Sequence, residues 1–106
     1  MKAGIDTMIN EKIEKLLNDQ LNRELYSAYL YLSIEAYFNS INLQGFAHWF
    51  RVQVQEERDH ALLFFEYINR AGGRVRLQPI EGPKTEFASI EEALGLTLEH
   101  ERFVTK

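Results

Sequence analysis

The chain has 106 residues, which suits one small domain, and its hydrophobic content of 45% excludes a disordered composition. A formal net charge of −4 gives no electrostatic basis for binding nucleic acid. Cysteine is absent, which excludes disulfides and thiolate chemistry and favours a cytoplasmic location. No apolar run is long enough to span a membrane, and the N-terminal segment lacks the apolar core of a signal peptide.

The first predicted helix covers about residues 7–39, a proline-free stretch rich in leucine, glutamate, lysine and alanine. The polar segment NSINLQG at 39–45 predicts a short turn. A second helix is expected over about 43–71, antiparallel to the first because the turn is so short. Gly72 and Gly73 follow it and predict a left-handed cap at its end.

A connection over about 73–88 follows, in which prolines and glycine exclude a helix. A third helix is predicted from Ser89, because Ser89 and Glu92 have the spacing of a capping box. The connection is long enough to run the whole length of the second helix, so the third helix is expected parallel to the second. The predicted fold is all-α: a four-helix bundle with one long crossover, of which this chain supplies helices one and two and the start of helix three. We expect 1–106 to be a single domain that is incomplete at its C-terminal end.

Acidic side chains interrupt the apolar face of each predicted helix. Glu24 lies on that face in the first helix, Glu57 and His60 in the second, and Glu101 in the third. A carboxylate kept from water needs a counter-charge, and a shared metal ion would provide one for all three helices. The i, i+3 spacing lets Glu57 and His60 ligate the same ion, and carboxylates with one imidazole suit iron, manganese or zinc. Each glutamate taken alone could instead be solvated at the edge of its face, and His60 could be a core histidine.

Three other residues of the second helix have plainer expected roles. Arg58 and Asp59 point away from the apolar face and are expected in solvent, while Glu56 at its margin is either solvated or part of an auxiliary cation site.

Tyr31 in the first helix is expected in the core, where its phenol could donate a hydrogen bond or an electron. Helix one carries more tyrosines than one core face needs, which indicates a second buried side against another subunit. Two histidines are expected not to be primary ligands: His48, facing outward, and His100, at the edge of the apolar face.

Three segments together resemble ferritin, specifically the haem-free ferritins of bacteria and archaea. They are LNDQLNRELYSAYLYLSIEAYF at 17–38, GFAHWFRVQVQEERDHALLFFEYI at 45–68 and LEHERFVTK at 98–106. The resemblance covers nearly the whole chain. It implies iron storage by a homo-oligomer, a 24-subunit cage in the complete family fold, which oxidises Fe(II) with O₂ at a di-iron carboxylate centre and deposits ferric mineral.

The resemblance also implies roles for particular residues. Glu24, Glu57 and His60 match ligands of the first iron site, and Glu57 also matches the carboxylate that bridges both irons. Glu101 matches a ligand of the second iron site, and Tyr31 matches a tyrosine beside the centre. Glu56 matches a ligand of the third iron site.

The sequence departs from this family pattern in two ways. Haem-binding relatives bind haem through a methionine of the second helix. The second predicted helix of this chain has no methionine and carries Arg58 in the relevant stretch, so no haem is expected. The family's chain also continues well beyond the point reached here. The alternative to a ferroxidase is therefore a truncated, non-catalytic chain that acts as a self-associating structural unit. A related di-iron protein that consumes peroxide is a third possibility, although the rubredoxin-like cysteine site typical of such proteins is absent.

Overall fold

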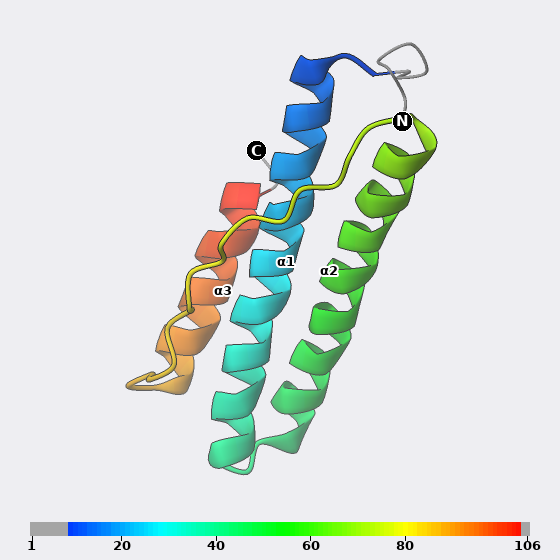
Figure 1. Ribbon diagram of the computed structural model, residues 1–106. Coiled ribbons are helices and arrows are strands. Elements are labelled where there is room, and N and C mark those ends of the chain that lie inside the picture. Colours follow the sequence, from blue (N-terminus) through cyan, green and yellow to red (C-terminus); the bar gives the residue numbers. More distant parts are fainter. Residues whose placement is uncertain (1–8, 105–106) are drawn as a thin grey trace.

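A computed structural model describes residues 9–104, and three helices account for most of them. They are α1 (Glu11–Ser40), α2 (Gln44–Arg70) and α3 (Ile90–Val104). Figure 1 shows α1 and α2 as an antiparallel hairpin, after which the chain crosses back along the helices and starts α3 beside the α1–α2 turn. Helix α3 therefore runs parallel to α2 and lies against α1. The prediction of an all-α fold with one long crossover is confirmed.

Each helix begins or ends where local hydrogen bonding dictates. The Asn10 side chain accepts a hydrogen bond from the backbone N–H of Ile13 at 2.8 Å, so α1 begins at Glu11. The predicted start at Thr7 lies outside the described residues. Helix α2 differs from its predicted bounds by one residue at each end. It ends ahead of Gly72, whose φ of 88° is the left-handed conformation that glycine adopts without steric cost.

The expected capping box starts α3. The Glu92 N–H donates to the Ser89 hydroxyl oxygen at 3.1 Å, and the Glu92 carboxylate accepts from the Ala88 N–H at 2.8 Å. The return bond therefore reaches one residue further back than the standard motif, in which the N–H of the capping serine itself is the donor. These two bonds satisfy backbone groups that the first turn of a helix leaves open.

The core lies between α1 and α2, and one end of it is closed by α3. Leu30, Tyr31, Ile34, Phe38 and Phe50 are almost fully buried there, together with Ala93 of α3. A second cluster, nearer the start of α1, is formed by Leu21, Ala61 and Ile68.

Some residues predicted on the apolar faces are not buried. Ile13 and Phe46 are 40% and 42% exposed, and Leu98 of α3 is 64% exposed. Helical periodicity predicts that Ile90, Leu94 and Leu98 share the apolar face of α3. Ile90 and Leu94 are partly buried against the core cluster, whereas Leu98 is exposed, so this prediction is wrong for Leu98 only. The most deeply buried residues of α3 are Ala93 and Thr97, because small side chains let this helix approach the core closely.

Two asparagines of α1 hold the crossover in place, a role that no local sequence pattern predicts. The amide of Asn18 donates to the Arg74 carbonyl at 3.0 Å and its oxygen accepts from the Arg76 N–H at 2.7 Å. One turn later, Asn22 donates to the Arg76 carbonyl at 3.0 Å and accepts from the Gln78 N–H at 2.9 Å. The two side chains thus pair with alternate residues of an extended segment, as a neighbouring strand would.

A buried carboxylate on α1 also has a dedicated partner. Glu35 is 5% exposed, and the Arg51 guanidinium of α2 binds both of its carboxylate oxygens, at 3.0 and 2.8 Å. This fork geometry compensates the carboxylate for its loss of water and fixes how α1 and α2 align near their turn.

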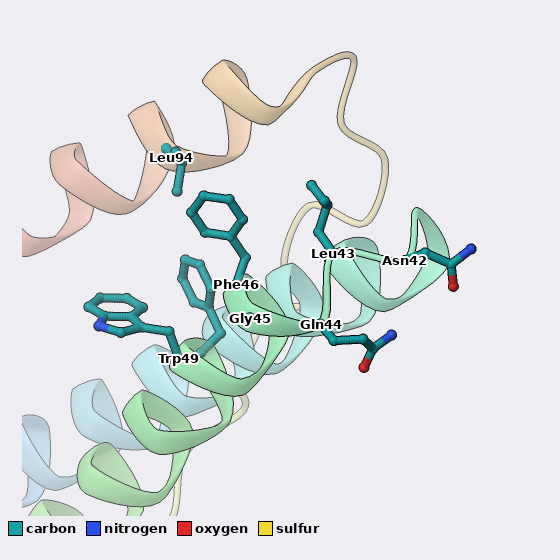
Figure 2. A pocket seen from close by; sticks show the side chains of 8 residues that line it. Asn42, Leu43, Gln44, Gly45, Phe46, Trp49 and Leu94 are labelled. Atoms are coloured by element: carbon teal, nitrogen blue, oxygen red, sulfur yellow. The ribbon is translucent and has the colours of Figure 1, made fainter.

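An apolar pocket of about 670 Å³ opens between the start of α2 and α3. Figure 2 shows Phe46 and Trp49 of α2 beside Leu94 of α3 at this pocket. Trp49 is 51% exposed, so this face of the described residues presents aromatic surface to solvent. None of the helices in the described part of the chain combines the length and apolarity that a membrane span requires.

Candidate metal centre

Three of the predicted ligands come together at the middle of the α1–α2 hairpin. Glu24 projects from α1, and Glu57 and His60 project from adjacent turns of α2. One ligand atom from each lies within 4.8 Å of the others, and the His60 Nδ1 is 3.6 Å from a carboxylate oxygen of both glutamates. Atoms that share one metal ion at about 2.0–2.2 Å are separated by roughly 3–3.5 Å. The two 3.6 Å separations lie just above this range, and a donor set of two carboxylates and one imidazole suits a transition-metal cation.

The surroundings of Glu57 disfavour its ionised form as long as no cation is bound. The pKa of Glu57 is raised to about 8, mostly by burial and also by a hydrogen bond with Glu24 and by the charges of Glu24, Glu101 and Glu56. Glu24 is oriented by the Gln20 amide, which donates to its other oxygen at 2.9 Å. Acidic groups thus converge on one point, where a bound cation would replace the proton.

Helix α3 brings a third carboxylate, that of Glu101, to the same centre. The Tyr31 hydroxyl donates a hydrogen bond to Glu101, across the interface between α1 and α3. Burial and this bond to a carboxylate both raise the pKa of Tyr31, and the charges of Glu57 and Glu24 add to the effect. Tyr31 is 1% exposed, so its hydroxyl is a neutral donor that points from the core toward the acidic cluster.

The remaining sequence expectations for this part of α2 are met only in part. Arg58 and Asp59 are exposed, as expected for side chains that point away, and Glu56 is exposed as well. His60 was expected to point into the bundle, yet its side chain is 52% exposed. It lies on the flank of α2, so the cluster opens on a side that neither α1 nor α3 covers.

His100 has closer contacts than the sequence indicated. It is half-buried, and its Nε2 lies 2.7 Å from the hydroxyl oxygen of Ser27, a buried residue of α1. Burial lowers the pKa of His100. The signal in the sequence was its position directly before Glu101, together with a serine four residues before Tyr31. Without knowing how α3 packs on α1, the two could not be paired.

Comparisons with known proteins agree on one family. The model of the ferritin-like domain matches residues 14–106. A bacterial non-heme ferritin from Bacteroides fragilis is 38% identical over 93% of this chain and 62% of its own length. A probable bacterial non-heme ferritin-like protein from Haemophilus influenzae is also 38% identical, over 92% of this chain and 59% of its own length.

A solved structure leads to the same result. An open-pore ferritin from the hyperthermophilic archaeon Archaeoglobus fulgidus superimposes with a TM-score of 0.88 and 48% identity. The match covers 93% of this chain and 60% of the archaeal one. The chain thus spans about three fifths of the length of the proteins that it matches.

Proposed function

The chain belongs to the ferritin-like domain family, and on this basis we propose that it binds Fe(II) and promotes its oxidation by O₂, for storage as ferric mineral. Fe(II) is the substrate in this proposal, and the protein side chains supply the site. The supporting observation is the convergence of Glu24, Glu57 and His60, with one ligand atom of each within 4.8 Å of the others.

The role proposed for each metal-binding residue follows from its position. Glu24 and His60 hold one Fe(II), and Glu57, whose carboxylate interacts with those of both Glu24 and Glu101, can bridge to a second ion. Two ions held close together can pass one electron each to a single O₂ molecule. We propose a di-iron carboxylate centre without haem on this basis.

The protein side chains contribute to the proposed reaction through their charges and their protonation states. Glu57 has a pKa near 8 before metal binds, so it gives up a proton when Fe(II) enters. Tyr31 remains protonated and orients Glu101 through its hydroxyl, because burial raises its pKa. Glu56 is exposed beside the cluster, where it can attract Fe(II) toward the open flank; we keep it as a candidate ligand of a further ion.

The test is the initial rate of Fe(II) oxidation in air, followed by ultraviolet absorbance. Glu57→Ala and His60→Ala are each expected to slow the reaction about 10-fold or more, since each removes a direct ligand. Asp59→Ala is the control, because its exposed side chain lies on the same helix but points away from the cluster. Equal rates in Glu57→Ala, His60→Ala and the parent would contradict the proposed site.

A structural role is the second candidate, and the apolar pocket favours it. Phe46, Trp49 and Leu98 expose large side chains on the face shown in Figure 2 and along α3. Copies of the chain that cover this face would form a self-associating unit whether or not they oxidise iron. This role alone applies if the chain assembles into defined oligomers while Glu57→Ala leaves the oxidation rate unchanged.

A further inference from the structure

Ser27 and His100 form a polar contact beside the proposed metal centre without belonging to its ligands. The distance from the His100 Nε2 to the Ser27 hydroxyl oxygen is 2.7 Å, and Ser27 is only 3% exposed. Such a bond is costly to lose, since the Ser27 hydroxyl would be left buried without its hydrogen bond. It therefore holds α3 against α1 at one defined place.

The His100 ring also forms part of the surroundings of Tyr31. Its centroid lies 5.7 Å from that of Tyr31, with the two planes at 89°, and 5.9 Å from that of Tyr26. Phe50 also packs on the Tyr31 ring, at a centroid distance of 5.9 Å. Edge-to-face contacts of this kind restrict the orientation of the phenol. The His100 ring thus packs against one side of the Tyr31 ring.

The two hydrogen bonds between α1 and α3 lie side by side. Ser27 and Tyr31 are one turn apart on α1, and their partners His100 and Glu101 are consecutive on α3. Consecutive helical residues differ in direction by about 100° and turn as one body. Any rotation of α3 that separates His100 from Ser27 therefore turns Glu101 away from Tyr31 by the same angle.

Among the described residues, apolar packing of α3 on the core is confined to its first half, where Ile90, Leu94 and Leu96 lie against the core cluster. Close backbone contacts between helices are concentrated in the α1–α2 pair rather than at α3. Ala93 and Thr97 are the buried residues of α3, and both are small. Small side chains permit close approach but offer little resistance to rotation about the helix axis. The end of α3 that carries Glu101 depends on its polar contacts.

We propose that His100 is a positioning residue for the metal centre: by bonding Ser27 and packing against Tyr31, it holds α3 at the rotation that directs Glu101 toward Glu57. This inference rests on the proposed function, because Glu101 is taken as a ligand of the second ion. His100 itself contacts no metal in this scheme. Its effect passes through the Tyr31–Glu101 hydrogen bond.

The probe is Co(II), added without iron to the metal-free protein and followed by calorimetry and by the visible spectrum of the bound ion. In His100→Ala, the ion that depends on Glu101 is expected to bind about 10-fold more weakly, as is usual when a group that orients a ligand is lost. The ion held by Glu24, Glu57 and His60 is expected to bind as in the parent. Glu101→Gln gives the result for direct loss of the ligand.

Two further variants separate positioning from a general loss of packing. His100→Gln places an amide near the position of Nε2 and is expected to restore most of the lost affinity. Ser27→Ala removes one hydroxyl, keeps the ring in place and is expected to weaken the same ion, so the test stands even if His100→Ala does not fold. His48→Ala, an exposed histidine of α2, is the matched control and should bind both ions normally.

The outcomes distinguish this inference from the function on which it rests. If the parent binds Co(II) and both His100→Ala and Ser27→Ala match it in affinity and spectrum, the positioning role is overturned while the metal site stands. The positioning role is also overturned if His100→Gln binds as weakly as His100→Ala, or if Glu101→Gln loses no ion. If His60→Ala and the parent bind Co(II) equally, the proposed metal site itself fails.

Discussion

Glu57 is the residue of the candidate metal centre whose protonation is most strongly affected by its surroundings. It lies on α2, interacts with the carboxylates of Glu24 of α1 and Glu101 of α3, and has a side chain that is only 14% exposed. Burial and neighbouring carboxylates act in the same direction, raising its pKa from 4.5 to about 8. At neutral pH the metal-free protein therefore keeps a proton on this group, in a place where a cation would be bound more favourably.

The stability of the metal-free protein should depend on this proton. Between pH 4.5 and about 8 the folded state holds a proton on Glu57 that the unfolded state has lost, so this group's contribution to stability falls as pH rises across that window. Glu57→Gln removes the effect and should be more stable than the parent at pH 8 by about 1–3 kcal/mol. The measurement is urea unfolding at pH 5 and pH 8 in the presence of a chelator.

The matched control is Glu66→Gln, which makes the same change at an exposed position of α2. It should leave the difference in unfolding free energy between the two pH values as it is in the parent. An equal pH dependence in Glu57→Gln and the parent would show that Glu57 titrates normally. The same sign governs metal binding, which should strengthen as pH rises toward 8 because Glu57 must lose its proton.

At the scale of elements, the crossover depends on α1 as much as on its own sequence. Residues 74–78 have no helix of their own, and their backbone groups pair with the side chains of Asn18 and Asn22. Further along, the Ser33 hydroxyl donates to the Lys84 carbonyl at 2.6 Å. These contacts guide the connection along α1 and deliver the start of α3 beside the α1–α2 turn (Figure 1).

Asn22→Ala should loosen this connection. The substitution removes the bonds to the Arg76 carbonyl and the Gln78 N–H, at an expected cost of about 1–3 kcal/mol in the free energy of unfolding. Trypsin should also cut the native protein faster after Arg74 and Arg76, since the freed segment can enter a protease more readily.

The control for this change is Asn69→Ala, at an exposed position in the last turn of α2. Its trypsin digestion should follow the parent's course. If Asn22→Ala is cleaved no faster than Asn69→Ala, the asparagine bonds do not hold the crossover in place. Circular dichroism at matched temperature confirms that the helices themselves persist in both variants.

The whole molecule carries more apolar surface than a chain acting alone would be expected to expose. Besides the face in Figure 2, an almost wholly apolar depression lies on another side, between α1, α2 and the crossover. Its lining includes Leu25, Tyr29, Leu32, Val54 and Ile80. Leu32 and Tyr29 are 44% and 47% exposed. Apolar surface of this extent is typical of a protein interface, so we propose that the chain forms a homo-oligomer.

Leu32→Arg tests this proposal at the centre of the depression. A buried charge without a partner is strongly unfavourable in an interface, so the variant should shift toward smaller species in sedimentation velocity. Gln55→Arg introduces the same charge at an exposed position of α2 that does not line the depression, and should sediment like the parent. Identical profiles for Leu32→Arg and the parent would exclude this face from the assembly, and a folded monomer in the parent would exclude a homo-oligomer altogether.

Local patterns were sufficient to predict much of this molecule. The left-handed Gly72, the Ser89 and Glu92 cap and the long proline-containing connection each act over a few residues, so helix ends and the crossover could be inferred from the chain alone. The i, i+3 spacing of Glu57 and His60 likewise follows from helix geometry. The sequence by itself therefore determined the three helices, their order and direction, and the position of Glu57 and His60 on one face of α2.

Contacts between distant segments were decided only by the tertiary structure. The rotation of α3 about its own axis placed Thr97 and His100 against α1 and left Leu98 exposed, contrary to the apolar pattern. The Asn18 and Asn22 bonds to the crossover and the half-exposed position of His60 also depend on how helices pack. The physical reason is that periodicity defines the faces of one helix, whereas the partner of each face is chosen by side-chain size and hydrogen bonding across the interface.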